Sequence, residues 1–154
     1  MHDGADHDPC PRILIVDDDP DSAVALAGLF EMSGARTVVA FGAEVGLHQM
    51  QVFKPAAAVI DLRMPGLDGC EALLEARRLE LVHPATLFVC CTASTDPADE
   101  ARCRVAGFDL FLHKPIQQDE LAMVVAWAAQ RMLVIDFMDH PPQTGYELDA
   151  RMPL

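Results

Sequence analysis

Acidic side chains gather at the ends of two apolar segments, where they could bind a cation or act as a nucleophile. Asp17, Asp18 and Asp19 directly follow four apolar residues in the segment "ILIVDDDPDS", and the segment "AAAVID" ends on Asp61. Carboxylates that lie close together raise one another's pKa above about 3.9 and destabilise a fold, unless a cation is shared among them. The elements that carry these residues therefore decide whether they form a site.

Short apolar runs alternate with longer amphipathic segments along most of the chain. Runs rich in β-branched residues predict strands, and the segments between them have the periodicity of helices. The expected strands are Arg12 to Val16, Arg36 to Ala40, Ala56 to Asp61, Thr86 to Cys91 and Leu110 to His113. Helices are expected from Pro20, capped by Asp19, to near Gly34, and over Ala43 to Phe53, Cys70 to Glu80, Pro97 to near Gly107 and Gln118 to Arg131.

Strict alternation of five strands with five helices predicts an α/β fold with a parallel sheet covered on both faces. The expected fold is flavodoxin-like, a doubly wound (βα)5 three-layer sandwich with strand order 2-1-3-4-5. Ligands of such sheets bind beyond the carboxyl ends of the strands, so Asp17, Asp18 and Asp61 would converge there. Their oxygen atoms suit Mg²⁺, a hard cation that prefers oxygen ligands.

Two further polar residues reach the same edge of the predicted sheet. Thr92 directly follows the fourth expected strand, and Lys114 follows the fifth, with Pro115 behind it. A carboxylate nucleophile, a metal site, a hydroxyl group and an ammonium group are together what the capture of a phosphoryl group requires. The spacing therefore predicts phosphoryl chemistry on a carboxylate.

These motifs, in this order, resemble the receiver domain of two-component response regulators over Pro11 to Arg131. The resemblance rests on "ILIVDDDPDS", "VIDLRMPGLDG", "CCTAS" and "LFLHKPI". It implies a role for each matching residue: Asp61 as phosphoacceptor, Asp17 and Asp18 as Mg²⁺ ligands together with Asp61 and the backbone carbonyl of Arg63, Thr92 as switch hydroxyl, Lys114 as phosphate-binding residue, and Phe111 as switch aromatic. It also implies a cis peptide bond between Lys114 and Pro115.

The resemblance further implies the partners. The phosphoryl donor would be a phosphohistidine on a sensor histidine kinase or on a histidine phosphotransfer protein. The output would leave through the fourth helix, fifth strand and fifth helix, with Phe111 and exposed Met123 or Trp127 binding a downstream protein or a second copy. Met123 and Trp127 could instead be ordinary core residues of an amphipathic helix. Such a protein is not an enzyme in the usual sense, because it catalyses only its own phosphoryl transfer and autodephosphorylation.

Two alternative functions remain open at this point. A pseudo-receiver would be a binding module that has lost phosphorylation. A haloacid-dehalogenase-like phosphatase would use Asp17 as its nucleophile, in the D-x-D formed with Asp19, but the short chain and the position of Asp61 disfavour it. The side chain of Arg63 also has more than one possible place: beside the phosphoryl group, paired with a carboxylate across the crevice, or in solvent.

Composition limits the classes of function. The 154 residues, 51% of them hydrophobic, suffice for one ordinary core. A net charge of −13 repels nucleic acids and anionic membranes alike. No uninterrupted apolar run approaches the roughly 18 residues of a membrane span, and no secretion signal is present, so a cytoplasmic protein is expected.

Five cysteines without a C-x-x-C pair argue against a disulfide framework and a zinc site. Cys90 and Cys91 are expected to point to opposite faces of one strand, as small buried hydrophobic residues. The expected organisation is a disordered N-terminal segment over 1–11, a receiver domain over 12–131, and a C-terminal tail over 132–154 without an output domain.

Overall fold

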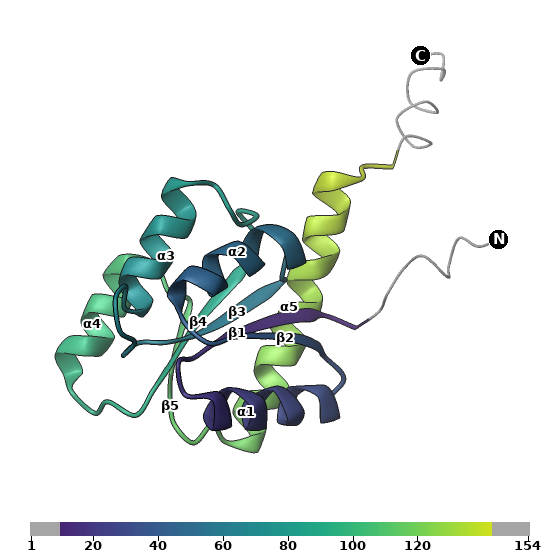
Figure 1. Ribbon diagram of the computed structural model, residues 1–154. Helices are drawn as coiled ribbons and strands as arrows, with labels where there is room; N and C mark the ends of the chain where they lie inside the picture. Colours follow the sequence, from purple (N-terminus) through teal and green to yellow (C-terminus); the bar gives the residue numbers. More distant parts are fainter. Residues whose placement is uncertain (1–9, 143–154) are drawn as a thin grey trace, which may run out of the picture.

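The apolar runs pair into one parallel sheet in the computed structural model, which describes residues 10–142 (Figure 1). The strand order is β2-β1-β3-β4-β5, and every neighbouring pair is parallel. The strands are β1 (Arg12–Val16), β2 (Arg36–Ala40), β3 (Ala57–Asp61), β4 (Leu87–Thr92) and β5 (Leu110–His113). The predicted fold class and strand order are confirmed. Strands β3 and β4 begin one residue later than expected, and β4 also ends one residue later, on Thr92.

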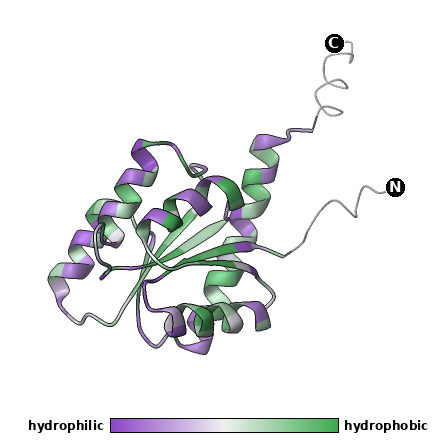
Figure 2. Cartoon of the chain, in the orientation of Figure 1, coloured by the Kyte–Doolittle hydropathy of each residue, from purple (hydrophilic) through white to green (hydrophobic). Residues whose placement is uncertain are grey.

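Helices cover both faces of the sheet, so the structure has three layers. The helices are α1 (Pro20–Met32), α2 (Ala43–Phe53), α3 (Gly69–Arg78), α4 (Pro97–Ala106) and α5 (Gln118–Asp139). Buried residues of α1 and α5 form one apolar cluster with the sheet, and those of α2, α3 and α4 form the other. Figure 2 shows the resulting pattern, with hydrophobic strands between helices whose outer sides are hydrophilic.

Aspartate side chains fix where three of the helices begin after the strand-end loops. Asp19 accepts a hydrogen bond from the amide of Asp21 at the start of α1, as predicted. Asp68 does the same for α3 within a capping box, and Asp96 caps α4. Each cap satisfies an amide that the helix itself leaves without a partner. The caps therefore fix the points at which these three loops end and the helices begin.

The last helix is eight residues longer than predicted. Met132 and Ile135 continue the buried stripe of its earlier turns, so the apolar periodicity runs on past Arg131. The guanidinium of Arg131 lies beside that stripe and donates to the carbonyl of Ala85 at 3.0 Å. The helix was expected to end at Arg131, and this is wrong, because Arg131 lies within the helix beside its buried stripe.

Helix α5 is also long and apolar enough, by length and composition alone, to cross a membrane, with a mean hydropathy of 1.6 over 18 residues. Its buried stripe packs on the sheet as part of the core, which accounts for only part of its apolar composition, since 28% of this window is buried. In Figure 1 its C-terminal turns project past the sheet. These turns expose the apolar side chains of Leu133, Val134, Phe137 and Met138.

Most of the N-terminal segment over 1–11 and of the C-terminal tail lies outside the described residues, since 1–9 and 143–154 are not described. Pro11 is an exception, because it is buried and its carbonyl accepts a hydrogen bond from the amide of Arg36 at 2.9 Å. The expectation of disorder is therefore wrong for Pro11.

The cysteines behave as small hydrophobic residues. Cys90 and Cys91 belong to the two opposite apolar clusters, as predicted. No disulfide is formed by the cysteines of the described part of the chain. The Sγ atom of Cys103 lies 3.4 Å from that of Cys90 and 3.6 Å from that of Cys70, and burial raises the pKa of the Cys70 thiol to about 12. Neutral, buried thiols of this kind are poor nucleophiles.

Candidate functional site

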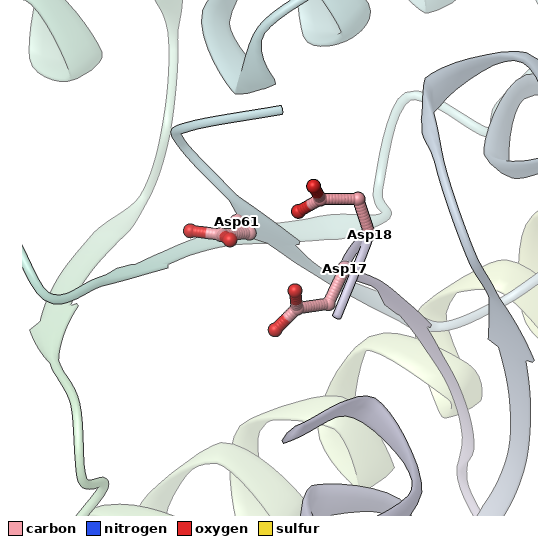
Figure 3. A group of neighbouring side chains, drawn as sticks. All are labelled: Asp17, Asp18 and Asp61. Carbon is pink, nitrogen blue, oxygen red and sulfur yellow. The ribbon is translucent and has the colours of Figure 1, made fainter. Parts of the chain in front are cut away.

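Three carboxylates converge at the carboxyl edge of the sheet, as predicted. Strand β1 leads directly into Asp17 and Asp18, and its neighbour β3 ends on Asp61. One oxygen atom from each side chain lies within 4.8 Å of the others. Figure 3 shows the three side chains pointing to the same side, beyond the strand ends. Asp17 and Asp61 are 3% and 9% exposed, whereas Asp18 is exposed to solvent.

The backbone around the site explains this placement. The amide of Asp17 donates to the carbonyl of Ala40 at 3.0 Å, so pairing with β2 continues past the end of β1. The loop after β3 folds back on itself, and the amide of Gly69 donates to the carbonyl of Leu62 at 2.9 Å. A Cβ atom on Gly69 would lie 2.6 Å from the carbonyl oxygen of Asp61, so this close approach requires glycine.

Lys114 places a positive charge between two of the carboxylates. Its Nζ atom lies 2.8 Å from Oδ2 of Asp17 and 3.5 Å from Oδ2 of Asp61. The backbone holds it there, because its amide donates to the carbonyl of Thr92 at 2.8 Å. The following Lys114–Pro115 peptide bond is cis, as the sequence resemblance implies.

The electrostatic environment differs sharply between the two buried acids. Burial raises the pKa of Asp61 to about 6; the negative charge of Asp17 adds to this rise, and Lys114 opposes it. Burial also acts upward on the pKa of Asp17, but the bond from Lys114 and the amide of Asp19 outweigh it, so that this pKa falls. Of the two, Asp61 is therefore the acid that is less stabilised as an anion in the folded protein.

The donor set fits a hard divalent cation. All three side chains offer carboxylate oxygens, and a single lysine does not balance their negative charge. Oxygen ligands with access to water are what Mg²⁺ prefers. No nitrogen or sulfur ligand joins this group among the described residues, which argues against zinc or copper.

Thr92 closes the crevice on the side of β4. It is the last residue of that strand, it is buried, and β4 lies beside β3, where Cys91 pairs with Asp61. Its hydroxyl oxygen accepts a hydrogen bond from the amide of Ser94 at 3.1 Å. Thr92 thus borders the carboxylate cluster from the neighbouring strand end.

Phe111 lies within β5, three residues before Lys114. It occupies the edge strand β5, where it pairs with Cys90 and is half-buried against the apolar cluster of α2, α3 and α4. Its ring meets that of His113 edge-on, with centroids 5.3 Å apart. On α5, Trp127 is 38% exposed and Met123 is partly buried, so Trp127 is not an ordinary core residue.

Arg63 adopts one of the arrangements predicted for it, in which it pairs with a carboxylate. Its Nη2 atom lies 2.6 Å from Oδ2 of Asp99, in the first turn of α4. The hydroxyl of Ser94 also donates to Asp99, and these two donors, Ser94 first, hold the pKa of Asp99 below its usual value against the effect of burial. Neither Asp99 nor Ser94 was predicted, since an acid in a first helical turn reads as ordinary dipole stabilisation.

An apolar cavity of about 330 Å³ opens beside Lys114. It lies between α1 and the loop that joins β5 to α5, and Leu26, Leu29 and Ile116 contribute to its walls. A hydrophobic surface therefore adjoins the charged crevice.

The chain is similar to one family of known proteins. Residues 13–126 match the family model described as response regulator receiver domain. The chain is 34% identical to the regulatory protein AtoC of Escherichia coli over 119 residues, which cover 77% of the chain and 25% of AtoC. It is 31% identical to the sensor histidine kinase GacS of Pseudomonas protegens over 145 residues, which cover 91% of the chain and 16% of GacS.

Solved structures agree with these sequence matches. The crystal structure of a CheY-like response regulator receiver domain protein from Methanospirillum hungatei aligns with a TM-score of 0.71 and 25% identity. The alignment covers 80% of this chain and 97% of that one. The chain thus corresponds to a nearly complete structural unit there, although it spans a quarter or less of the length of AtoC and GacS.

Proposed function

The chain belongs to the response regulator receiver domain family of two-component systems, and from this membership we propose that Asp61 accepts a phosphoryl group from a phosphohistidine. The donor would be a sensor histidine kinase or a histidine phosphotransfer protein. The observation that carries the proposal is the position of Asp61, whose carboxylate lies at the carboxyl edge of the sheet with Lys114 Nζ at 3.5 Å and the acidic pair beside it.

In the proposed reaction a carboxylate oxygen of Asp61 forms a bond to phosphorus while the bond between phosphorus and the histidine nitrogen breaks. The result is an aspartyl phosphate and a histidine that takes up a proton. The ammonium of Lys114 would contact the phosphoryl oxygens, because it already lies between Asp61 and Asp17. Asp61 is ionised at neutral pH, since its pKa of about 6 lies below 7, so a carboxylate oxygen is available as the nucleophile.

The metal ligands would be Asp17, Asp18, Asp61 and the backbone carbonyl of Arg63. When bound, Mg²⁺ neutralises negative charge on the phosphoryl oxygens and on the attacking carboxylate. Without it, Asp17 and Asp18 would repel the incoming phosphoryl group. The acidic pair therefore supports this function only together with a cation.

The response to phosphorylation would pass through Thr92 and Phe111. A phosphoryl group adds a charge of about −1.5 to −2 and three acceptor oxygens, to which the Thr92 hydroxyl can donate. In moving, the Thr92 hydroxyl would lose the hydrogen bond that it accepts from the amide of Ser94. The movement would also open space toward half-buried Phe111 on β5. The equilibrium between two arrangements of α4, β5 and α5 would then shift.

The partners follow from the surfaces that border the site. The phosphodonor would dock over α1 and the apolar cavity beside Lys114. A downstream protein or a second copy would bind the face of α4, β5 and α5, where Trp127 is exposed. The net charge of −13 disfavours direct binding to nucleic acid. We place these events in the cytoplasm, where the phosphodonors of such relays act.

Incubation with acetyl phosphate and Mg²⁺ tests the proposal directly. Intact-mass spectrometry should show one added phosphoryl group that is lost in acid and in base, and Asp61→Asn should abolish it. Asp119→Asn, which changes an exposed acid in the first turn of α5, is the matched control and should be labelled like the wild type. Labelling that survives in Asp61→Asn but disappears in Asp17→Asn would support the phosphatase alternative, and no labelling by acetyl phosphate or a kinase would support a pseudo-receiver.

A further inference from the structure

An ion pair joins the loop after Asp61 to the first turn of α4. The guanidinium of Arg63 lies 2.6 Å from Oδ2 of Asp99, across 36 residues of sequence. The two side chains differ in exposure, since that of Arg63 is 62% exposed and that of Asp99 only 8%. A largely solvent-exposed cation thus meets a carboxylate that the fold holds in one place.

Asp99 has a second partner, which links the pair to the strand end of β4. The hydroxyl of Ser94 donates to the same Oδ2 atom of Asp99, and the amide of Ser94 donates to the hydroxyl oxygen of Thr92 at 3.1 Å. Asp99 also occupies the first turn of α4, where backbone amides favour a negative charge. Asp99 would therefore remain stabilised as an anion if Arg63 moved away.

We propose that Arg63 exchanges partners during signalling, from Asp99 in the unmodified protein to the phosphoryl oxygens on Asp61. This inference rests on the proposed phosphorylation of Asp61. Arg63 is two residues from Asp61, and its guanidinium can bind phosphoryl oxygens with two parallel hydrogen bonds. The greater charge of a phosphoryl group makes it the stronger competitor for that guanidinium. The exchange would release the first turn of α4 from the β3–α3 loop.

In this arrangement Arg63 is a positioning residue for the phosphoryl group, and Asp99 competes for it. Removing Arg63 and removing the charge of Asp99 should therefore affect phosphoryl binding in opposite directions. Arg63→Ala removes the favourable contact with the phosphoryl group. Asp99→Asn keeps the shape and the hydrogen bond from Ser94 but frees Arg63, so the phosphoryl group no longer has to displace a carboxylate. A merely structural role for the ion pair would make both substitutions act in the same direction.

Titration with beryllofluoride, a phosphoryl analogue, in the presence of Mg²⁺ tests the exchange by fluorine NMR. One charge-assisted contact of this kind predicts about fivefold weaker binding in Arg63→Ala and about threefold tighter binding in Asp99→Asn. The double variant should bind like Arg63→Ala, because Asp99 acts only through Arg63. The control is Arg104→Ala, which removes an ion pair with Glu100 within α4 itself and should leave the affinity unchanged.

Hydrogen–deuterium exchange supplies a readout that does not depend on affinity. The amides of the first turn of α4 should exchange severalfold faster in the beryllofluoride-bound wild type than in the unmodified protein. In Arg63→Ala they should exchange fast in both states, and in Arg63→Lys only partly, since lysine keeps the charge but not the two parallel bonds.

Three results would overturn the exchange. The first is a change of affinity in the same direction for Arg63→Ala and Asp99→Asn. The second is tighter binding by Asp99→Asn that persists in the Arg63→Ala background, which would make it an effect of charge alone. The third is unchanged or slower exchange of the α4 amides on loading. Wild-type protein that binds no beryllofluoride at all would refute both this inference and the proposed function, whereas the first three results leave phosphorylation of Asp61 intact.

Discussion

Replacing the proposed phosphoacceptor should stabilise the metal-free protein. Asp61 lies 9% exposed beside Asp17, and its pKa rises from the ordinary 3.8 to about 6 in the folded state. One pKa unit corresponds to about 1.4 kcal/mol, so the ionised carboxylate costs the folded state about 3 kcal/mol relative to the neutral acid. Asp61→Asn imitates the neutral acid in shape and removes this cost.

The effect of pH on this difference has a definite sign. Between pH 4 and 6 the folded protein holds a proton on Asp61 that the unfolded chain has already released. The contribution of Asp61 to the stability of the wild type therefore falls as pH rises through this window, and its full cost is present above the folded pKa. The advantage of Asp61→Asn should thus grow from about 1.5 kcal/mol at pH 5 to about 3 kcal/mol at pH 8.

Urea unfolding followed by circular dichroism, with EDTA present, measures this difference at the two pH values. In thermal unfolding at pH 8, the melting temperature of Asp61→Asn should exceed that of the wild type by roughly 6 to 12 °C. Glu44→Gln is the matched control, because it removes one negative charge from an exposed position in the first turn of α2. The reasoning is refuted if Asp61→Asn is no more stable than the wild type at pH 8, or if its advantage does not grow with pH. Addition of Mg²⁺ should narrow the gap by stabilising the wild type.

Three further outcomes follow from the same geometry. Asp18→Ala should weaken Mg²⁺ binding in calorimetry by tenfold or more, yet raise the melting temperature in EDTA, because it relieves repulsion among the carboxylates; an unchanged affinity would show that Asp18 is not a ligand. Lys114→Met should lower the free energy of unfolding at pH 8 by about 2 kcal/mol, since two buried carboxylates lose their counter-charge, and an unchanged value in urea unfolding would contradict this. Gly69→Ala should cost about 2 kcal/mol in the same assay, because its Cβ would lie 2.6 Å from the carbonyl oxygen of Asp61; a stability equal to that of the wild type would exclude this close contact.

The convergence of Asp17, Asp18 and Asp61 could be predicted because it depends on topology alone. In a parallel sheet all strands end at one edge, and the apolar runs showed where β1 and β3 end. The same reasoning placed Thr92 and Lys114 at that edge. Neighbouring strands lie about 4.8 Å apart, so the correct strand order is enough to bring these side chains together.

Other features resisted prediction because they depend on contacts between distant residues. Arg63 had several possible partners, and only the position of α4 brought Asp99 within 2.6 Å of its guanidinium. The length of α5 was underestimated because the packing of Met132 and Ile135 on the sheet extends the helix past Arg131. From the local sequence pattern alone, a charged residue that lies beside a buried stripe within a helix looks the same as one that ends the helix.

The sequence by itself determined the α/β alternation and the residues that end each strand, since periodicity and strand ends are local properties. The strand order is not local, and it could be predicted only because this alternation is typical of flavodoxin-like sheets. Only the tertiary structure decided how strongly each carboxylate of the site is stabilised as an anion, and which carboxylates Lys114 and Arg63 pair with. The pKa of Asp61 depends on how deeply its neighbours bury it and on distances of a few ångströms to Asp17 and Lys114. Coulomb and desolvation energies vary steeply over such distances, and no local pattern along the chain encodes them.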